Sequence, residues 1–220
     1  HVHFTLDGSG PARFTPPDFI DWPDLPDDPA ATLRRIDLDD LSAQSVRDWK
    51  VGETLLLSGR LYTGRDAAHR RMAEMIAKGE PLPVDLRDKA IYYVGPVDAV
   101  RDEVIGPAGP TTSTRMDRYL STVLPATGLR VMIGKAERGP AAIATIKEAG
   151  AVYLIAVGGA AYLVAQSIRS ARVVAWPDLG MEAIHEFEVR DMPVMVAVDT
   201  TGASVHSTGP ALWRGKFRLP

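Results

Sequence analysis

The sequence contains no cysteine, no long apolar run and no excess of basic residues. Without cysteine, the 220-residue chain cannot form a disulfide, use a thiol nucleophile or hold a metal through thiolates. No stretch reaches twelve unbroken apolar residues, which argues against a membrane-spanning helix. A formal charge of −3 leaves no basic stripe of the kind that nucleic acids require. We therefore expect a soluble globular protein that binds neither membrane nor nucleic acid, and any cysteine-held cofactor must belong to another chain.

The amino-terminal residues have little in common with a targeting segment. HVHFTLDGSG has neither a positively charged start nor an apolar stretch, so a cytoplasmic location is the expectation. The chain does not begin with methionine, which suggests processed material or a piece excised from a longer polypeptide. Residues 7–30 are dense in Pro, Asp and Gly and show no period. We expect an extended connector over residues 1–30, a globular domain over 31–206 and a tail over 207–220.

Apolar periodicity predicts alternating strands and helices in the globular part. Residues 54–61 read as a buried strand, followed by a helix that Asp66 caps and that ends near Gly79. Strands at 129–133 and 151–157 flank a helix between Pro140 and Gly150, which is a parallel βαβ unit. The other expected elements are a helix at 42–49, a strand at 90–94, a helix from 116, a helix from 158 to 168, and strands at 172–175, 184–189 and 194–199.

Four loops between strands and helices stand out as candidate ligand-binding segments, because α/β sheets bind ligands at the carboxyl ends of their strands. They are TGRDAAH (63–69), GPTTSTRM (109–116), GKAERG (134–139) and GGAA (158–161). Three of them carry a cation close to a helix start, namely Arg65, Arg115 and Lys135.

A cation at a helix N-terminus opposes the helix dipole, so an anion is its natural partner. Two arginines and a lysine together suggest a ligand with two anionic groups, either a small dicarboxylate or a phosphate compound. Each cation taken singly is also explained as a surface charge paired with a neighbouring acid.

Other side chains in these loops have two interpretations each. Thr111 or Thr112 is typical of a helix N-cap, while the second hydroxyl remains free for chemistry. His69 could carry a proton, although a hydrogen-bonded structural histidine is the commoner case. Gly158 and Gly159 follow a strand but lack the dinucleotide-binding spacing, and helix–strand packing explains them equally well. The sequence shows no catalytic triad, no paired-carboxylate site and no zinc spacing.

Over residues 34–206 the sequence resembles the class I, iron–sulfur-dependent fumarate hydratases and the related tartrate dehydratase β subunits. The resemblance rests on seven motifs in order: KVGE (50–53), SGRLYTGRDAAH (58–69), IYYVGP (91–96), GPTTSTRM (109–116), GK (134–135), VGGAA (157–161) and GMEAI (180–184).

The resemblance implies the architecture of the family and its division of labour. The fold would be an α/β swivelling β/β/α domain, with a mixed sheet, helices and a second β layer. A four-iron, four-sulfur cluster would be held by a cysteine-bearing α domain or subunit and not by this chain. The assembly would be a homodimer that binds a small dicarboxylate and reversibly hydrates fumarate to malate. Tartrate and mesaconate are alternative substrates, and a non-catalytic dicarboxylate-binding module is the alternative from another functional class.

The resemblance also implies roles for individual residues. Arg65 and Arg115 would hold substrate carboxylates with help from Lys135 and Thr112, and Asp66 and His69 would support them. Thr111 would lie on the proton-transfer path together with an acidic residue of the absent domain, because a threonine hydroxyl alone is a poor base. Ser113-Thr114 and the continuation AERG after GK depart from the commoner family pattern and could reshape the pocket.

Overall fold

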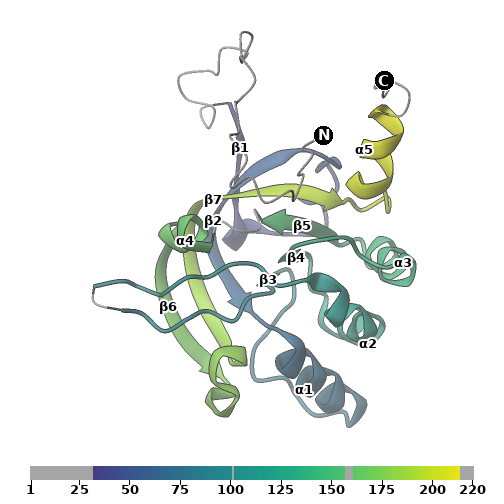
Figure 1. Ribbon diagram of the computed structural model, residues 1–220. Helices are drawn as coiled ribbons and strands as arrows, with labels where there is room; N and C mark the ends of the chain where they lie inside the picture. The colour runs from purple at the N-terminus through teal and green to yellow at the C-terminus, as the bar shows by residue number, and fades with distance from the viewer. Residues whose placement is uncertain (1–31, 101, 157–160, 214–220) are drawn as a thin grey trace, which may run out of the picture. The chain divides into compact units, whose positions relative to one another are not determined.

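The computed structural model describes residues 32–100, 102–156 and 161–213 (Figure 1). Contacts divide the chain between Thr32 and Leu33, and every element below belongs to the second unit. The expected connector over 1–30 and the glycine pair at 158–159 lie outside the described residues.

Seven strands form one mixed sheet in the order β1-β2-β3-β4-β5-β7-β6. Neighbours from β1 to β5 are parallel, whereas β7 runs antiparallel to β2, β5 and β6. The parallel β4–α3–β5 unit confirms the expected βαβ arrangement. The strands are β1 (Arg34–Asp37), β2 (Thr54–Thr63), β3 (Ala90–Tyr92), β4 (Val131–Gly134), β5 (Val152–Ala156), β6 (Ile168–Ala175) and β7 (Ile184–Val198).

The long strand β7 closes part of the sheet into a ring. It pairs with β5 near its end and with β2 along most of its length, while β2 also pairs with β3. Hydrogen bonds therefore run from β2 through β3, β4, β5 and β7 back to β2. Alternate apolar side chains of all five strands, such as Leu57, Tyr92, Ile133, Leu154 and Phe187, pack together in one fully buried core. This core fills the interior of the ring.

Three helices cover the other face of β3, β4 and β5, and Figure 1 shows them side by side. They are α1 (Asp66–Ala77), α2 (Asp117–Thr127) and α3 (Pro140–Glu148). Met72, Leu120 and Ile146, one from each helix, are buried in a second core with the outward side chains of the strands. The remaining elements are α4 (Ala161–Gln166), α5 (Val205–Trp213) and the 3₁₀ turns η1 (Leu38–Asp40), η2 (Ser113–Met116) and η3 (Pro177–Glu182).

The helix expected at residues 42–49 is wrong, because this segment forms turns. The backbone N–H of Ser42 donates to Ser45 Oγ at 2.9 Å, and that of Ser45 donates to Ser42 Oγ at 3.1 Å. Such short side-chain bonds to the backbone compete with helix formation. The hydrogen bonds of the two serine hydroxyls thus stabilise turns over the helix that the sequence pattern weakly predicts.

The two strands expected at 184–189 and 194–199 are one strand, β7, with a bulge between them. Asp191 adopts a positive φ of 51°, and its N–H donates to Ser58 Oγ where the register with β2 shifts. The interruption in the sequence pattern marks this bulge and not a chain reversal. Strand β6 also starts earlier than expected, at Ile168, and α5 spans the expected domain boundary at residue 206.

None of the helices in the described part of the chain is both long and apolar enough to cross a membrane.

Candidate functional site

The loops after β3 and β4 are held against each other at the carboxyl ends of these strands. The N–H of Thr111 donates to the carbonyl of Tyr93 at 2.7 Å, and the N–H of Ser113 donates to that of Lys135 at 3.1 Å. Thr112 and Lys135 also form a parallel bridge. Two of the four loops singled out in the sequence therefore meet at one edge of the sheet, as strand order requires.

Arg65 lies at the carboxyl end of the adjacent strand β2, one residue before α1. Its side chain passes over Gly95, where an added Cβ would collide with Nη1 and lie 2.9 Å from Cδ. Nη2 forms an ion pair with Glu182 Oε1 at 3.6 Å. The buried Nε has no hydrogen-bond partner among the described residues. The ion pair with Glu182 thus positions the guanidinium of Arg65, while its Nε–H remains available to a ligand.

Asp66 is not the cap of α1, which corrects the expectation from the sequence. Arg65 occupies the N-cap position without a side-chain bond, and the N–H of Ala67 donates to Glu182 Oε2 at 2.8 Å. Asp66 Oδ1 instead accepts from Arg118 Nη2 at 2.7 Å and from Tyr119 Oη at 3.0 Å. Burial raises the pKa of the Asp66 carboxyl, but the two hydrogen bonds together with the nearby arginine charges lower the pKa overall.

His69 is fully buried behind the Arg65 loop. Its Nδ1 lies 2.9 Å from the carbonyl oxygen of Arg65. Burial lowers the pKa of His69 to about 4, so the ring is neutral at physiological pH. These features favour the structural interpretation of His69 over the proton carrier.

Arg115 and Thr111 are in direct contact. Nη2 of Arg115, in η2, donates to Thr111 Oγ1 at 2.5 Å. Thr112 occupies the N-cap position of η2 but makes no side-chain cap bond, whereas the Thr111 hydroxyl lies outside the cap position and accepts from Arg115. The positive charge of Arg115 also lowers the pKa of Asp66, beside Arg65. The turn η2, which carries Arg115, is in contact with α1.

Ser113 belongs to the buried support of the site. Its side chain is fully buried, with Oγ 2.8 Å from Tyr153 Oη and accepting the N–H of Lys135 at 3.2 Å. A Cβ at Gly134 would collide with this hydroxyl. The Ser113 hydroxyl therefore holds the backbone of Lys135 in place.

Two further site residues, Glu182 and Gly95, were missed by reasoning from the sequence. Glu182 both pairs with Arg65 and accepts the N–H of Ala67 at the start of α1, where a carboxylate is favourable. Gly95 gives the Arg65 side chain its space. Both lie in quoted motifs, IYYVGP and GMEAI, which were the available signal.

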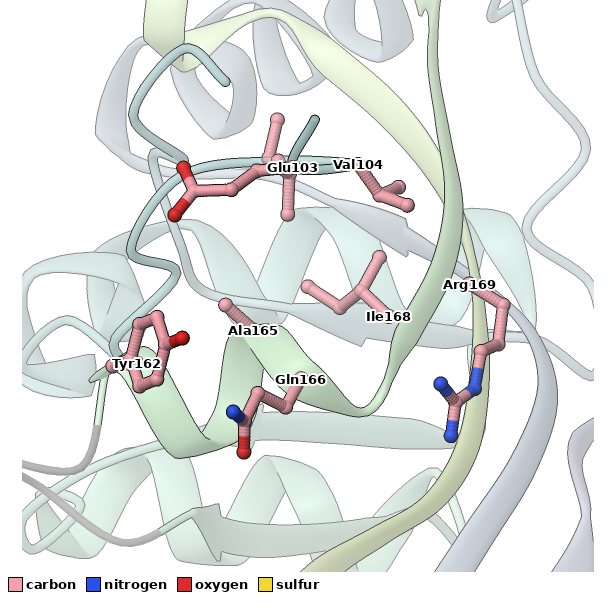
Figure 2. Close-up of a pocket in the computed structure, with 8 residues that line it drawn as sticks. Glu103, Val104, Tyr162, Ala165, Gln166, Ile168 and Arg169 are labelled. Atoms are coloured by element: carbon pink, nitrogen blue, oxygen red, sulfur yellow. The ribbon is translucent and has the colours of Figure 1, made fainter. Parts of the chain in front are cut away.

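A separate hollow of about 500 Å³ lies between the loop at 103–105 and the α4–β6 segment (Figure 2). Its lining includes Glu103, Tyr162, Gln166 and Arg169, and none of the site residues above. It is therefore distinct from the strand-end site.

The fold and the site define an α/β domain with a candidate anion-binding site, built from two arginines, a lysine and a threonine on loops after three adjacent parallel strands. The chain belongs to the fumarase C-terminus family, whose profile matches residues 8–209.

Named relatives agree with this membership. Fumarate hydratase 2 of Leishmania major is 35% identical over 190 residues, which cover 84% of this chain and 34% of the relative. The aerobic class I fumarate hydratase of Escherichia coli K12 is 38% identical over 158 residues, covering 71% of this chain and 29% of the relative. The putative L(+)-tartrate dehydratase subunit beta of Methanocaldococcus jannaschii is 38% identical over 171 residues, which cover 76% of this chain and 88% of the relative. The chain thus spans about a third of the fumarate hydratases and most of the β subunit.

Proposed function

We propose that this chain is the substrate-clamping domain or β subunit of a class I hydro-lyase that reversibly hydrates fumarate to malate. The observation that carries the proposal is the strand-end site, where the buried Nε of Arg65 has no partner among the described residues and Arg115 contacts the Thr111 hydroxyl. The names of the relatives support the same chemistry.

In this proposal the cations bind the two carboxylates of the substrate. Arg65 and Arg115 each offer a planar fork that matches a carboxylate, and Lys135 adds charge from the neighbouring loop. Thr112, which forms a backbone bridge with Lys135, would contact the same ligand. A dicarboxylate therefore suits the site better than a singly charged ligand.

Thr111 would take or return the proton at the carbon next to a substrate carboxylate. A hydroxyl is a weak base, but the N–H of Arg115, 2.5 Å from its oxygen, stabilises negative charge there. An acidic residue of the partner would complete the proton path. Asp66 and His69 act indirectly, by holding Arg118 and the Arg65 backbone.

The residues of this chain do not fit an iron–sulfur cluster. Such clusters bind through cysteine thiolates, and the sequence has none. Within the described ranges, moreover, no three His, Asp or Glu side chains are grouped to hold a metal ion. The proposed four-iron, four-sulfur cluster therefore belongs to a cysteine-bearing α domain or subunit.

The finer features of the family remain proposals for this chain. We propose the swivelling three-layer β/β/α arrangement, for which the closed ring of strands and its helix layer give support. A cytoplasmic homodimer and the domain limits 31–206 are proposed with it. Tartrate is the second candidate substrate, because the relative that this chain nearly spans is named as a tartrate dehydratase subunit; mesaconate is a third.

Reconstitution tests the proposed function. The chain alone should show no fumarate hydration, because it lacks a cluster-binding set, and activity should appear when it is joined anaerobically with the cysteine-bearing partner. Fumarate, tartrate and mesaconate are assayed in parallel by following formation or loss of the unsaturated acid. Hydration by the metal-free chain alone would contradict the division of labour, and dicarboxylate binding without turnover in the complex would favour the non-catalytic module.

Gly95→Ala should weaken substrate binding in the reconstituted enzyme. The new methyl group collides with Arg65 Nη1 and lies 3.1 Å from the Met181 carbonyl oxygen, so the arginine must move. We expect KM to rise by about tenfold, equivalent to about 1.4 kcal/mol, with a smaller change in kcat. Gly209→Ala is the matched control, since a Cβ there meets nothing within 4 Å. An unchanged KM in Gly95→Ala would remove Arg65 from the binding site.

A further inference from the structure

Four buried polar atoms on the helix-covered face of the sheet have no hydrogen-bond partner among the described residues. They are His69 Nε2, Tyr93 Oη, and Nη1 and Nη2 of Arg138. His69 and Tyr93 are completely buried, and Arg138 is 2% exposed. An unsatisfied buried polar atom destabilises a fold by more than one hydrogen bond stabilises it. Four of them in one place require an explanation.

These atoms belong to a single cluster. The rings of His69 and Tyr93 meet edge to face at 5.2 Å, and Arg138 Cζ lies 5.5 Å from the Tyr93 ring and 4.8 Å from the Tyr153 ring. Burial lowers the pKa of His69, and the positive charge of Arg138 lowers it further. Burial raises the pKa of Tyr93, and the same charge opposes that rise. Arg138 and Tyr93 lie close enough for their polar atoms to interact. None of the four atoms, however, has a hydrogen bond of good geometry among the described residues. Arg138 Cζ thus lies over two aromatic rings, and its Nε is bonded to Asp117.

The donors and acceptors of the cluster are complementary to a water molecule. The carbonyl of Arg65 can only accept, so the contact with His69 Nδ1 places the proton on Nδ1 and leaves Nε2 as an acceptor. Arg138 offers only donors, and the Tyr93 hydroxyl can do both. Water can accept from Arg138 while donating to His69, as internal waters commonly do.

An anion is a poor occupant of the same place. Arg138 Nε already donates to Asp117 Oδ1 at 2.6 Å, so its charge is compensated. An added anion would bring an uncompensated charge into the interior, at a large desolvation cost. A neutral hydrogen-bonding molecule avoids that cost.

We infer that internal water bridges His69, Tyr93 and Arg138, and that this hydrated cluster positions the anion-binding loops. His69 holds the carbonyl of Arg65, while Asp117, the partner of Arg138, begins α2 two residues after Arg115. Asp117 Oδ2 also accepts the N–H of Gly139 at the end of the Lys135 loop. The three cation-bearing segments are thus connected through the cluster. The positioning role rests on the proposed function, whereas the water site does not.

Tyr93→Phe tests the water site by the sign of its effect on thermal stability. If water bonds the hydroxyl, the variant loses a hydrogen bond and the unfolding midpoint falls by about 2–4 °C. Loss of a direct contact with Arg138 would have the same sign, so ordered water in a high-resolution crystal structure must accompany the fall. If the hydroxyl is bare, its removal relieves an unsatisfied group and the midpoint rises or does not change, which overturns the inference. Tyr92→Phe, at the neighbouring last residue of β3, is the matched control, because Tyr92 Oη donates to the Ala108 carbonyl at 2.7 Å in the other core. Its midpoint should fall in either case.

Kinetics of the reconstituted enzyme test the positioning role. Tyr93→Phe should raise KM for fumarate about three- to tenfold with little change in kcat, while Tyr92→Phe leaves KM unchanged. A lower midpoint with equal KM values in both variants would overturn the positioning role and leave the water site standing. If the complex hydrates no substrate, the proposed function fails, and the midpoints together with a high-resolution crystal structure still decide the water site. Ordered water between at least two of the three side chains is the expected density, and a dry cluster would overturn the inference.

Discussion

Arg115→Met should lower kcat/KM of the reconstituted enzyme by about 2–5 kcal/mol in free-energy terms, much of it through a higher KM. The substitution removes a charge-assisted, two-pronged contact and leaves a substrate carboxylate unpaired. It also removes the N–H that lies 2.5 Å from Thr111 Oγ1, so kcat should fall as well. Steady-state kinetics with fumarate measure both parameters.

The size of the loss in kcat/KM depends on how far water is excluded from the site. Arg115 is exposed in this chain, and exposed ion pairs contribute only about 0–1 kcal/mol. A loss above 2 kcal/mol therefore requires the partner domain to close over the site.

Two further variants separate these contributions. Arg115→Lys keeps the charge without the fork and should recover part of the activity. Arg172→Met removes an exposed arginine that pairs with Glu186 and should leave the kinetics unchanged. An Arg115→Met enzyme as active as the Arg172→Met enzyme would exclude Arg115 from the clamp.

The elements that the sequence predicts best are those with local causes. Strand β2, helix α1 and the β4–α3–β5 unit follow from apolar spacing, from Pro140 at the start of α3 and from the glycines that follow the helices. The closing of the ring by β7 was not predicted, because it pairs residues more than a hundred positions apart, such as Thr54 and Met195. Alternation of apolar residues shows that a strand is half buried but does not show which strand it joins.

In the candidate site, too, contacts with local causes could be predicted from the sequence, whereas long-range contacts could not. Thr111 and Arg115 are four residues apart, and their contact follows from one turn of local structure. Thr112 and Lys135 meet because adjacent parallel strands end at one edge of the sheet. By contrast, Glu182 lies 115 residues from the amide it caps, and only the folded chain shows that it replaces Asp66 as the acceptor at the start of α1. The family motifs located Glu182 without indicating its role.

Thr111→Val should reduce kcat by roughly 10²–10⁴ while KM changes little, if the hydroxyl carries the proton. Valine keeps nearly the same volume and removes only the oxygen that accepts from Arg115. The N-cap position of η2 is held by Thr112 and not by Thr111, so a loss of helix capping does not account for an effect of this size. Measuring kcat, KM and the free energy of unfolding of this one variant separates chemistry from stability.

Two matched variants sharpen the comparison. Thr114→Val makes the same change at an exposed position in η2 and should keep full activity, whereas Thr111→Ser retains a hydroxyl and should recover most of kcat. If Thr111 only supports Arg115, the loss in Thr111→Val should appear as a higher KM together with at most about 1 kcal/mol of unfolding free energy, since one exposed hydrogen bond is at stake. A Thr111→Val enzyme with normal kcat would show that the proton travels through another group, and the acidic residue of the partner domain would then be the first to substitute.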